Sequence, residues 1–569
     1  MTGREGLTYF SRFDAESVYE DRGWLIGRGP VGGKAKGLAF AFFALQGTPL
    51  EDQVSLPPAT IVASTEIFSE FIHDNAMEWV YSEPDISKIE LAFAKGRMRE
   101  SVTKDLYRAL EILGERPLAI RSSSLLEDSV QLSFAGKYDT CFSANVGSPE
   151  RKARELEDGI RSVWASLFNL APRAYRSKHG YRDEDEAMAV VIQPIMGKAH
   201  GHLYYPELAG AAFSKVYRRP TPRVRKEDGL MRLCFGLGTR TVDRAKARVF
   251  YLTNPNLRPE GNQPGEIASA SQVEFDYIDR NFGAFMTGSL RQFLPYILKQ
   301  HKSVHSFVEI YTDNLLYWAG SPLKRFSKPV FSFSALPTRQ PHLFQVMRSL
   351  LAHLENAMGL PVDIEFTYDT ENRELSLIQM RPLAAYEEMA QVIIPEVPAD
   401  RLLLRGNRMV SNGVLEHTNH LVYVDPDLYG TDATFYEVAR EVGRANAKLA
   451  GTKYILVGPG RWGSTNPDLG VPVKYNEICH CGCMVEVGIR ESNFTPELSY
   501  GTHFFLDLDV DGILYLPVFA GESGNTYNKE WFDNTPFEQG HHPAVRVYQG
   551  DFAVYMDRSE EHTSELQSH

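Results

Sequence analysis

Helical and strand-like patterns alternate over residues 24 to about 215. Apolar residues at helical spacing follow GGKAKG through LAFAFFAL, and a second such pattern covers ERKARELEDGIRSVWASLF. The short apolar runs in PLAIRSS and AMAVVIQPI are typical of buried strands. This mixture predicts an α/β or α+β domain.

The remaining chain divides into a mixed region and a strand-rich region. Residues 230 to 395 contain a predicted helix, HLFQVMRSLLAHLENAM, that ends before Gly359. From about residue 400, segments such as YILVGPG, CMVEVGI and GILYLPVF predict a β-rich C-terminal domain. Proline clusters in ALPTRQP and IIPEVPAD mark boundaries. We predict domains at 1–215, 216–395 and 451–558, a connecting segment at 396–450 and an appended tail at 559–569.

The segment VDIEFTYDTENRELSLIQMRPL has the pattern of a β-hairpin, with alternating apolar and acidic residues before the polar stretch DTENRE. With the turn centred on Asn372, Glu365 lies opposite Gln379. The same register places Asp363 opposite Arg381 on that face. Two adjacent oxygen ligands suit Mg²⁺, which also takes phosphate oxygens, and a nearby arginine neutralises phosphate charge. The alternative is a surface hairpin with an exposed acidic face.

Two further segments are candidates for phosphate binding. In LAIRSSSLLEDSVQLSFAGKYDT, a strand delivers Arg121 into a serine-rich turn, and the loop SFAG leads to Thr140. The guanidinium of arginine donates paired hydrogen bonds to phosphate, and Gly136 lets backbone N–H groups approach an anion. In GPVGGKAKGLAF, paired glycines and Lys34 open a helix, where anions also bind. An ordinary polar turn and a solvated lysine are the alternatives, and the second segment lacks the P-loop spacing.

Composition narrows the classes of partner and compartment. Lys and Arg number 60 against 73 Asp and Glu, a net charge of −13, so we expect no general attraction to nucleic acid or anionic lipid. The sequence has no run of about 18 apolar residues, so we expect no membrane span. Its N-terminus is polar and charged, so we expect no secretory signal. Five cysteines, an odd number, favour a reducing cytoplasm. Oligomeric state stays open.

Taken in order, these motifs resemble one family. GGK, IRSSS…SFAGxxDT, SVWASLFNLAPRAYRSKHGY, MAVVIQPI, FGLG and DIEF…LIQMRPL occur in the order found in the nucleotide-binding domain of phosphoenolpyruvate synthase and pyruvate phosphate dikinase. The match covers roughly residues 25 to 385. The resemblance implies an α+β, ATP-grasp fold, in which the domains at 1–215 and 216–395 clamp ATP with Mg²⁺.

The resemblance also implies residue roles at the nucleotide. Lys34 and Arg121 would hold the phosphates, with Gly136 and Thr140 shaping the loop over them. Gln193, at the end of the AMAVVIQ strand, would lie near the adenine.

At the metal, the resemblance assigns Glu365 and Gln379 as ligands and places Arg381 against the phosphates. Arg121 and Arg381 are therefore the expected catalytic residues within this module.

Two features depart from the family. Where the family usually has FTxxPxTG, this chain has AAFSKVYRRPTPRVRK. We expect an exposed basic loop there, and a loop that binds an anionic acceptor is the alternative. No TSHAA-like phosphohistidine motif is found, and about 170 residues cannot hold the pyruvate barrel. We therefore do not expect this chain to make phosphoenolpyruvate.

The C-terminal region has landmarks of its own. The loop GPGRWG, around Arg461 and Trp462, is a candidate cradle for a phosphate or a flat ring. His503, between a glycine and a strand-like run, is a candidate phosphoryl acceptor or base, with a structural histidine as the alternative.

The cluster CHCGC places three cysteines at alternate positions, which on a strand would share one face. This spacing is too close for easy tetrahedral binding, and no second ligand pair completes a zinc site. Small strand residues are favoured over a metal or redox role.

The leading functional hypothesis is an ATP-dependent phosphotransferase that passes a phosphoryl or pyrophosphoryl group from Mg·ATP to an acceptor that the sequence does not identify. A non-catalytic ATP-binding sensor or scaffold is the alternative. Ligase chemistry through acyl phosphates ranks last.

Overall fold

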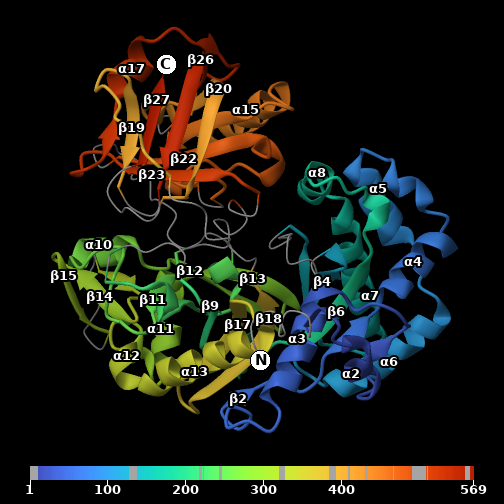
Figure 1. The fold of residues 1–569 in the computed structure, drawn as a ribbon. Helices are drawn as coiled ribbons and strands as arrows, with labels where there is room; N and C mark the ends of the chain where they lie inside the picture. Colours follow the sequence, from blue (N-terminus) through green and yellow to red (C-terminus); the bar gives the residue numbers. More distant parts are fainter. Residues whose placement is uncertain are drawn as a thin grey trace. The chain divides into compact units, whose positions relative to one another are not determined.

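The chain forms two compact units in the computed structural model. The first comprises most residues up to Ala385, and the second comprises Tyr386–His569 with the short segments Tyr217–Arg225 and Asp243–Ala245. The described residues are 10–126, 137–216, 221, 223–242, 246–319, 327–383, 392–407, 410–429, 434–464, 467–489, 508, 511–557 and 564–568. Both units are mixed α/β structures (Figure 1).

The first unit begins with a five-stranded sheet in the order β1-β3-β6-β4-β5, in which only β1 and β3 pair in parallel. Its strands are β1 (Leu25–Ile26), β3 (Ile61–Ala63), β4 (Leu118–Ser124), β5 (Thr140–Ser143) and β6 (Met188–Pro194). The helices of this region are α2 (Ala15–Glu20), α3 (Gly32–Leu45), α4 (Thr65–Asp74), α5 (Ile86–Lys95), α6 (Glu100–Leu113), α7 (Pro149–Ala165) and α8 (Leu170–Lys178). The strands predicted at PLAIRSS and AMAVVIQPI are thus confirmed as β4 and β6.

A six-stranded sheet follows in the order β11-β10-β9-β17-β18-β2. Its strands are β2 (Val54–Ser55), β9 (Leu208–Phe213), β10 (Leu230–Phe235), β11 (Arg248–Tyr251), β17 (Val362–Asp369) and β18 (Glu374–Pro382). Helix α13 (Pro341–Met358) packs on β9 and β17 and ends at Gly359 in the left-handed conformation, as the sequence predicted (Figure 1). The alternate apolar residues of β17 enter the core that α13 covers.

Two small antiparallel sheets complete the first unit. One contains β7 (Lys198–His200), β8 (Leu203–Tyr205), β12 (Glu274–Asp279) and β13 (Ala284–Ser289), and the other β14 (Glu309–Thr312), β15 (Leu315–Trp318) and β16 (Lys328–Val330). The helices here are α9 (Thr239–Val242), α10 (Pro264–Ser269), α11 (Leu290–Gln300) and α12 (Leu336–Arg339). Within the described chain, no helix combines the length and the apolar character that crossing a membrane requires.

Helix α3 contacts both main sheets of the first unit (Figure 1). Ala35 and Ala39 belong to the apolar cluster of the five-stranded sheet, whereas Phe40 and Leu45 belong to the core of the six-stranded sheet. This double burial explains why the sequence LAFAFFAL has no polar face. Gly37 allows the closest approach, because a Cβ atom there would lie 2.0 Å from the backbone oxygen of Met380.

The second unit contains a nine-stranded sheet, counted over its described residues. Its strands are β19 (Leu402–Gly406), β20 (Gly413–Val424), β21 (Tyr454–Pro459), β22 (Cys481–Gly488), β23 (Leu514–Phe519), β24 (Thr526–Tyr527), β25 (Glu538–Gln539), β26 (Val545–Met556) and β27 (Ser564–Ser568). Helices α14 (Pro426–Tyr429), α15 (Phe435–Lys448) and α17 (Lys529–Asn534) accompany it. β19 and β20 come from the stretch interpreted above as a connection, and β27 from the stretch interpreted as a tail.

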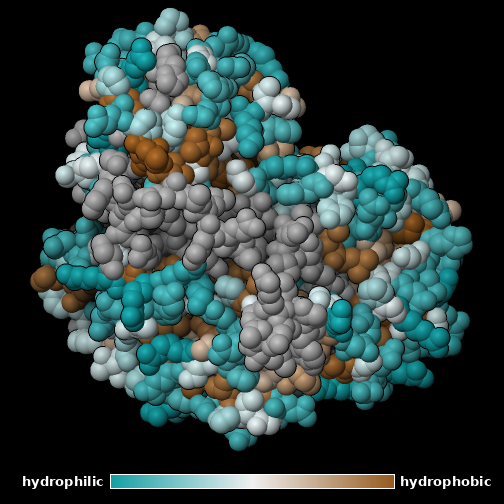
Figure 2. Space-filling model, viewed as in Figure 1, coloured by the Kyte–Doolittle hydropathy of each residue, from teal (hydrophilic) through white to brown (hydrophobic). Residues whose placement is uncertain are grey.

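Neighbouring strands β20, β21, β22 and β23 pair in parallel and carry apolar clusters on both faces. Trp462 is fully buried in one of them and donates its Nε1–H to the Val485 carbonyl at 2.9 Å. The ring is therefore a core residue and does not present a surface on which a ligand could stack. Figure 2 shows that hydrophilic residues cover most of the described surface in that view, with apolar residues in smaller patches.

The expectation that the three clustered cysteines share one face is wrong. A register shift in the pairing of β21 with β22 places Cys481 opposite Tyr454 and Cys483 opposite Ile455. Cys481 consequently packs in one apolar cluster and Cys483 in the other. Burial raises the pKa of the Cys483 thiol well above its ordinary value, which disfavours the thiolate that metals and redox partners need.

Gly37→Ala should destabilise the first unit by about 2 kcal/mol, because the new methyl group meets backbone rather than a movable side chain. Gly265→Ala in α10 is the matched control, since its Cβ would meet nothing closer than the Tyr311 hydroxyl at 3.6 Å. Thermal melts of both variants test the packing of α3. Equal melting temperatures for Gly37→Ala and the wild type would contradict it.

Candidate functional site

The β17–β18 hairpin has the predicted register at its polar face. Glu365 lies opposite Gln379, and Asp363 lies opposite Arg381. A β-bulge after Glu365 then shifts the pairing, so that Phe366 faces Leu377. The bulge leaves the site residues in place and alters only the half of the hairpin near the turn.

Arg381 and Gln379 have different surroundings on this face. The Nε and Nη2 groups of Arg381 donate to the buried carboxylate of Asp363 at 2.8 Å, which fixes the guanidinium plane. Gln379 is 5% exposed as a residue, and its Oε1 atom is a buried acceptor without a hydrogen-bond partner among the described residues. A buried amide oxygen in this state suits a cation or another donor that completes the site.

Arg121 reaches the hairpin from the other sheet. It lies on β4, and its Nη2 is 2.5 Å from Oε2 of Glu365. Burial is the largest single influence on Glu365 and acts to raise the pKa of its carboxyl group. The charge and hydrogen bond of Arg121 act in the opposite direction, aided by Arg381 and Lys34, and the pKa lies below its ordinary value. Glu365 is therefore an anion at neutral pH.

The GGK segment packs on the IRSSS strand. Gly32 has a φ of 72°, and a Cβ there would lie 2.0 Å from the Ser123 carbonyl oxygen. The backbone N–H of Ala35 donates to the Ser123 hydroxyl, and Nζ of Lys34 donates to the Ser122 hydroxyl at 3.1 Å. The first turn of α3 and Lys34 therefore lie against β4, the strand that carries Arg121.

The other expected residues lie nearby or outside the described chain. Nε2 of Gln193 is 3.4 Å from the Ile378 carbonyl oxygen, beside the hairpin bulge. Thr140 is exposed and pairs with Arg121 in the sheet. Gly136 and His503 fall outside the described residues.

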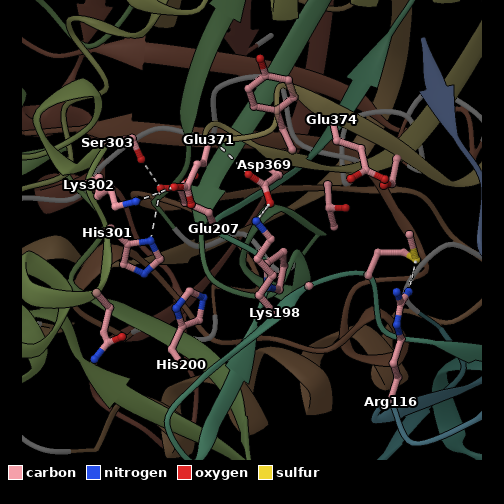
Figure 3. A pocket seen from close by; sticks show the side chains of 17 residues that line it. Arg116, Lys198, His200, Glu207, His301, Lys302, Ser303, Asp369, Glu371 and Glu374 are labelled. Carbon is pink, nitrogen blue, oxygen red and sulfur yellow. Dashed lines mark hydrogen bonds and ion pairs between the residues drawn. The ribbon is translucent and has the colours of Figure 1, made fainter. Parts of the chain in front are cut away.

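A cavity of about 400 Å³ lies along the same hairpin (Figure 3). Its lining residues are Arg116, Met196, Gly197, Lys198, His200, Pro206, Glu207, Gln300, His301, Lys302, Ser303, Thr367, Tyr368, Asp369, Glu371, Glu374 and Ser376. Thr367 is the next residue after Glu365 on the polar side of β17, so the cavity begins about 7 Å from Glu365 along the strand. The sequence analysis named none of these wall residues, although the alternation of the hairpin could have placed Thr367 and Asp369 on the same face as Glu365.

Glu207 joins three walls of the cavity. It accepts hydrogen bonds from Nδ1 of His301 at 3.2 Å and from the Ser303 hydroxyl (Figure 3). It also accepts hydrogen bonds from the hydroxyl and the N–H of Thr370, the latter at 2.9 Å. Burial acts to raise the pKa of Glu207, but these three partners hold it below its ordinary value. Such a network links residues that are far apart in the sequence, and no local pattern reveals it.

The side chain of His200, which lines the cavity, has a lowered pKa. Burial, and then the neighbouring His301, lower its pKa from 6.5 to about 4, with a smaller contribution from Lys198 against the opposing charges of Glu207 and Asp369. Its Nε2 atom is buried and has no hydrogen-bond partner in the described part of the chain. The imidazole is therefore neutral at pH 7.

The residues of this site lie within a range of the chain that matches a known protein family. The sequence profile of the family described as pyruvate phosphate dikinase, AMP/ATP-binding domain, matches residues 29–400, well over half of the chain. The chain belongs to this family. Its members bind adenine nucleotides by description, and the matched range contains the whole candidate site of this pyruvate phosphate dikinase-type chain.

Three relatives illustrate the similarity. An uncharacterized phosphotransferase, YvkC, of Bacillus subtilis is 26% identical over 354 residues, covering 62% of this chain and 34% of that protein. A probable phosphoenolpyruvate synthase of Archaeoglobus fulgidus is 31% identical over 29% of this chain and 23% of its own length. A rifampicin phosphotransferase of Streptomyces sviceus is 37% identical over 19% of this chain and 11% of its own. The chain thus spans about a third or less of these relatives.

The residues on the hairpin fit a divalent cation. Glu365 offers an anionic oxygen and Gln379 a buried neutral one, and Mg²⁺ takes one or two protein oxygens with phosphate oxygens and water. Among the described residues, no group of three or more His, Cys, Asp or Glu side chains forms a self-sufficient metal site. A cation here would accordingly need ligands from a bound molecule.

The lowered pKa of His200 predicts a pH-dependent stability. In the unfolded chain the His200 imidazole binds a proton with a pKa of 6.5, and in the folded chain only near 4. The contribution of neutral His200 to the free energy of unfolding is therefore complete above pH 6.5 and is lost as the pH falls toward 4. From pH 7.5 to 5.0, wild type should lose about 1–2 kcal/mol more than His200→Asn. Thermal melts at both pH values measure the difference. His73→Asn, which changes a side chain that is 81% exposed, should behave like wild type.

Proposed function

We propose that this chain is an ATP-dependent phosphotransferase that uses Mg·ATP to pass a phosphoryl or pyrophosphoryl group to an acceptor. The carrying observation is the arrangement at Glu365, where an ionised carboxylate lies opposite the buried Gln379 oxygen and against Arg121. One cation site and one phosphate-binding arginine meet there. The family assignment and the relatives named as phosphotransferases support the proposal.

The proposed positions of the phosphates follow from charge. Lys34, Arg121 and Arg381 come from three separate segments and act together on the Glu365 carboxyl group. Bound Mg²⁺, held by Glu365 and Gln379, would neutralise phosphate charge. The chain's own contribution is then positioning and charge stabilisation, without a protein nucleophile at this site.

The proposed position of the nucleoside is the cavity along the hairpin. From Glu365 to Asp369 the strand rises about 13 Å, a span suited to a triphosphate followed by a sugar and a base. The volume of about 400 Å³ lies in the range of small-molecule sites. Gln193 lies at the bulge between the two regions, which is compatible with the expected place of the adenine.

The two main sheets of the first unit are the proposed ATP-grasp subdomains. Residues of both sheets meet at the Arg121–Glu365 contact, so a nucleotide at this place would touch both. The second unit is proposed to be the separate β-rich domain, and His503 within its range stays a candidate for receiving the phosphoryl group.

Glu365→Ala should abolish ATP consumption, because it removes the anionic cation ligand and leaves Arg121 without its partner. Mass-resolved analysis of nucleotide products over a panel of acceptors measures the loss, and it also identifies the reaction. AMP with phosphate indicates dikinase-like chemistry, and ADP indicates simple kinase transfer.

Glu90→Ala, which removes an exposed carboxylate on α5, is the control and should turn over ATP as wild type does. Undiminished turnover in a folded Glu365→Ala variant would refute the site. ATP binding by wild type without any product over the whole panel would favour a sensor or scaffold.

Thr367→Trp should fill the start of the cavity and weaken ATP binding by tenfold or more, on the order of the 1.4 kcal/mol that such a factor represents. Inorganic triphosphate, which has no nucleoside, should bind this variant as it binds wild type. Calorimetry with the two ligands separates the outcomes. Equal losses for both would place the nucleoside elsewhere.

A further inference from the structure

The carboxylate that the cation needs is already bound by a guanidinium. Oε2 of Glu365 is 2.5 Å from Nη2 of Arg121, and the arginine side chain is 13% exposed. The opposite ligand, Oε1 of Gln379, has no such partner within the described chain. One of the two proposed cation ligands is therefore already bound by a cationic side chain of the protein.

The local charge balance opposes a free cation. Among the described residues, the cationic side chains of Lys34, Arg121 and Arg381 act on the Glu365 carboxylate, and Asp363 pairs with Arg381. The positive charges of this cluster therefore repel a cation that approaches Glu365. A free divalent cation would add two more and would have to displace Arg121 to a position close to itself.

A bound phosphate group would remove both obstacles, the ion pair of Arg121 with Glu365 and the repulsion between the cluster and the cation. A triphosphate offers the guanidinium of Arg121 a second anion of suitable geometry and releases Glu365 to the cation. The metal–nucleotide complex also carries net negative charge, which the cluster attracts. Displacement of the arginine and binding of the cation are then coupled to the same ligand.

We propose that Arg121 makes this site select the metal–nucleotide complex over the free cation, by occupying Glu365 until phosphate arrives. This inference rests on the proposed function, since it assigns Glu365 to the cation and Arg121 to the phosphates. Arg121 is in this respect a specificity-determining residue, with two successive partners.

The test measures Mn²⁺ binding with and without ATP, because Mn²⁺ takes the same oxygen ligands as Mg²⁺ and is visible by electron paramagnetic resonance. Wild type should bind free Mn²⁺ weakly and bind Mn·ATP tightly. Arg121→Met should bind free Mn²⁺ about tenfold more tightly, as expected for release of a charged hydrogen bond, and should bind Mn·ATP less tightly than wild type. These two changes have opposite signs, which a general loss of structure does not produce.

Three variants control the result. Arg121→Gln keeps a polar side chain and should repeat the effect if Arg121→Met folds poorly. Lys34→Met removes a charge that donates to the Ser122 hydroxyl, whereas Arg121 donates to Glu365 itself, and it should tighten free Mn²⁺ binding by less than about threefold. The double variant Arg121→Met with Glu365→Gln should lose the gain, since the released ligand is then absent.

The outcomes distinguish this inference from the proposed function. Unchanged or weaker free Mn²⁺ binding in both Arg121 variants, with tight Mn·ATP binding by wild type, overturns the inference and leaves the function standing. A gain that persists in the double variant also overturns it. Failure of wild type to bind Mn·ATP at all would instead remove the proposed function.

Discussion

The burial of helix α3 between two sheets is the constraint on which the first unit depends. The helix shares its side chains between two apolar cores, and Gly37 lets it contact the backbone of β18 directly. This packing sets the position of β4 relative to β18. Because Lys34 is in the first turn of the helix, the same contact also carries a cation to the place where the strands meet.

The polar face of the hairpin uses that arrangement. Strand geometry places Asp363, Glu365, Thr367 and Asp369 on one side, while their neighbours fill the core. One end of this face meets Arg121, and the other end is the wall of the cavity. A single hairpin therefore provides both an ionic region at Glu365 and a recess of small-molecule size that begins about 7 Å away along the strand.

In the second unit, residues that suggested ligand binding in the sequence are buried and serve packing. Its central parallel strands are covered on both faces, so cysteines and a tryptophan that suggested ligand sites are packing residues. The bulge at Gly482 separates Cys481 from Cys483, and Trp462 has its hydrogen bond within the core. A loop rich in glycine, such as GPGRWG, serves here to bring its tryptophan close to Gly458.

The sequence by itself determined the local elements and the facing pairs of the hairpin. Alternation and turn chemistry act over a few residues, and they were enough to place Glu365 opposite Gln379 and Asp363 opposite Arg381. Motif order also sufficed to identify the family. The tertiary structure alone decided that Arg121 binds Glu365, that α3 lies between two sheets, and that Glu207 and His301 line one cavity. Those contacts join segments that are about a hundred or more residues apart, and they depend on packing between elements, which periodicity within one element does not encode.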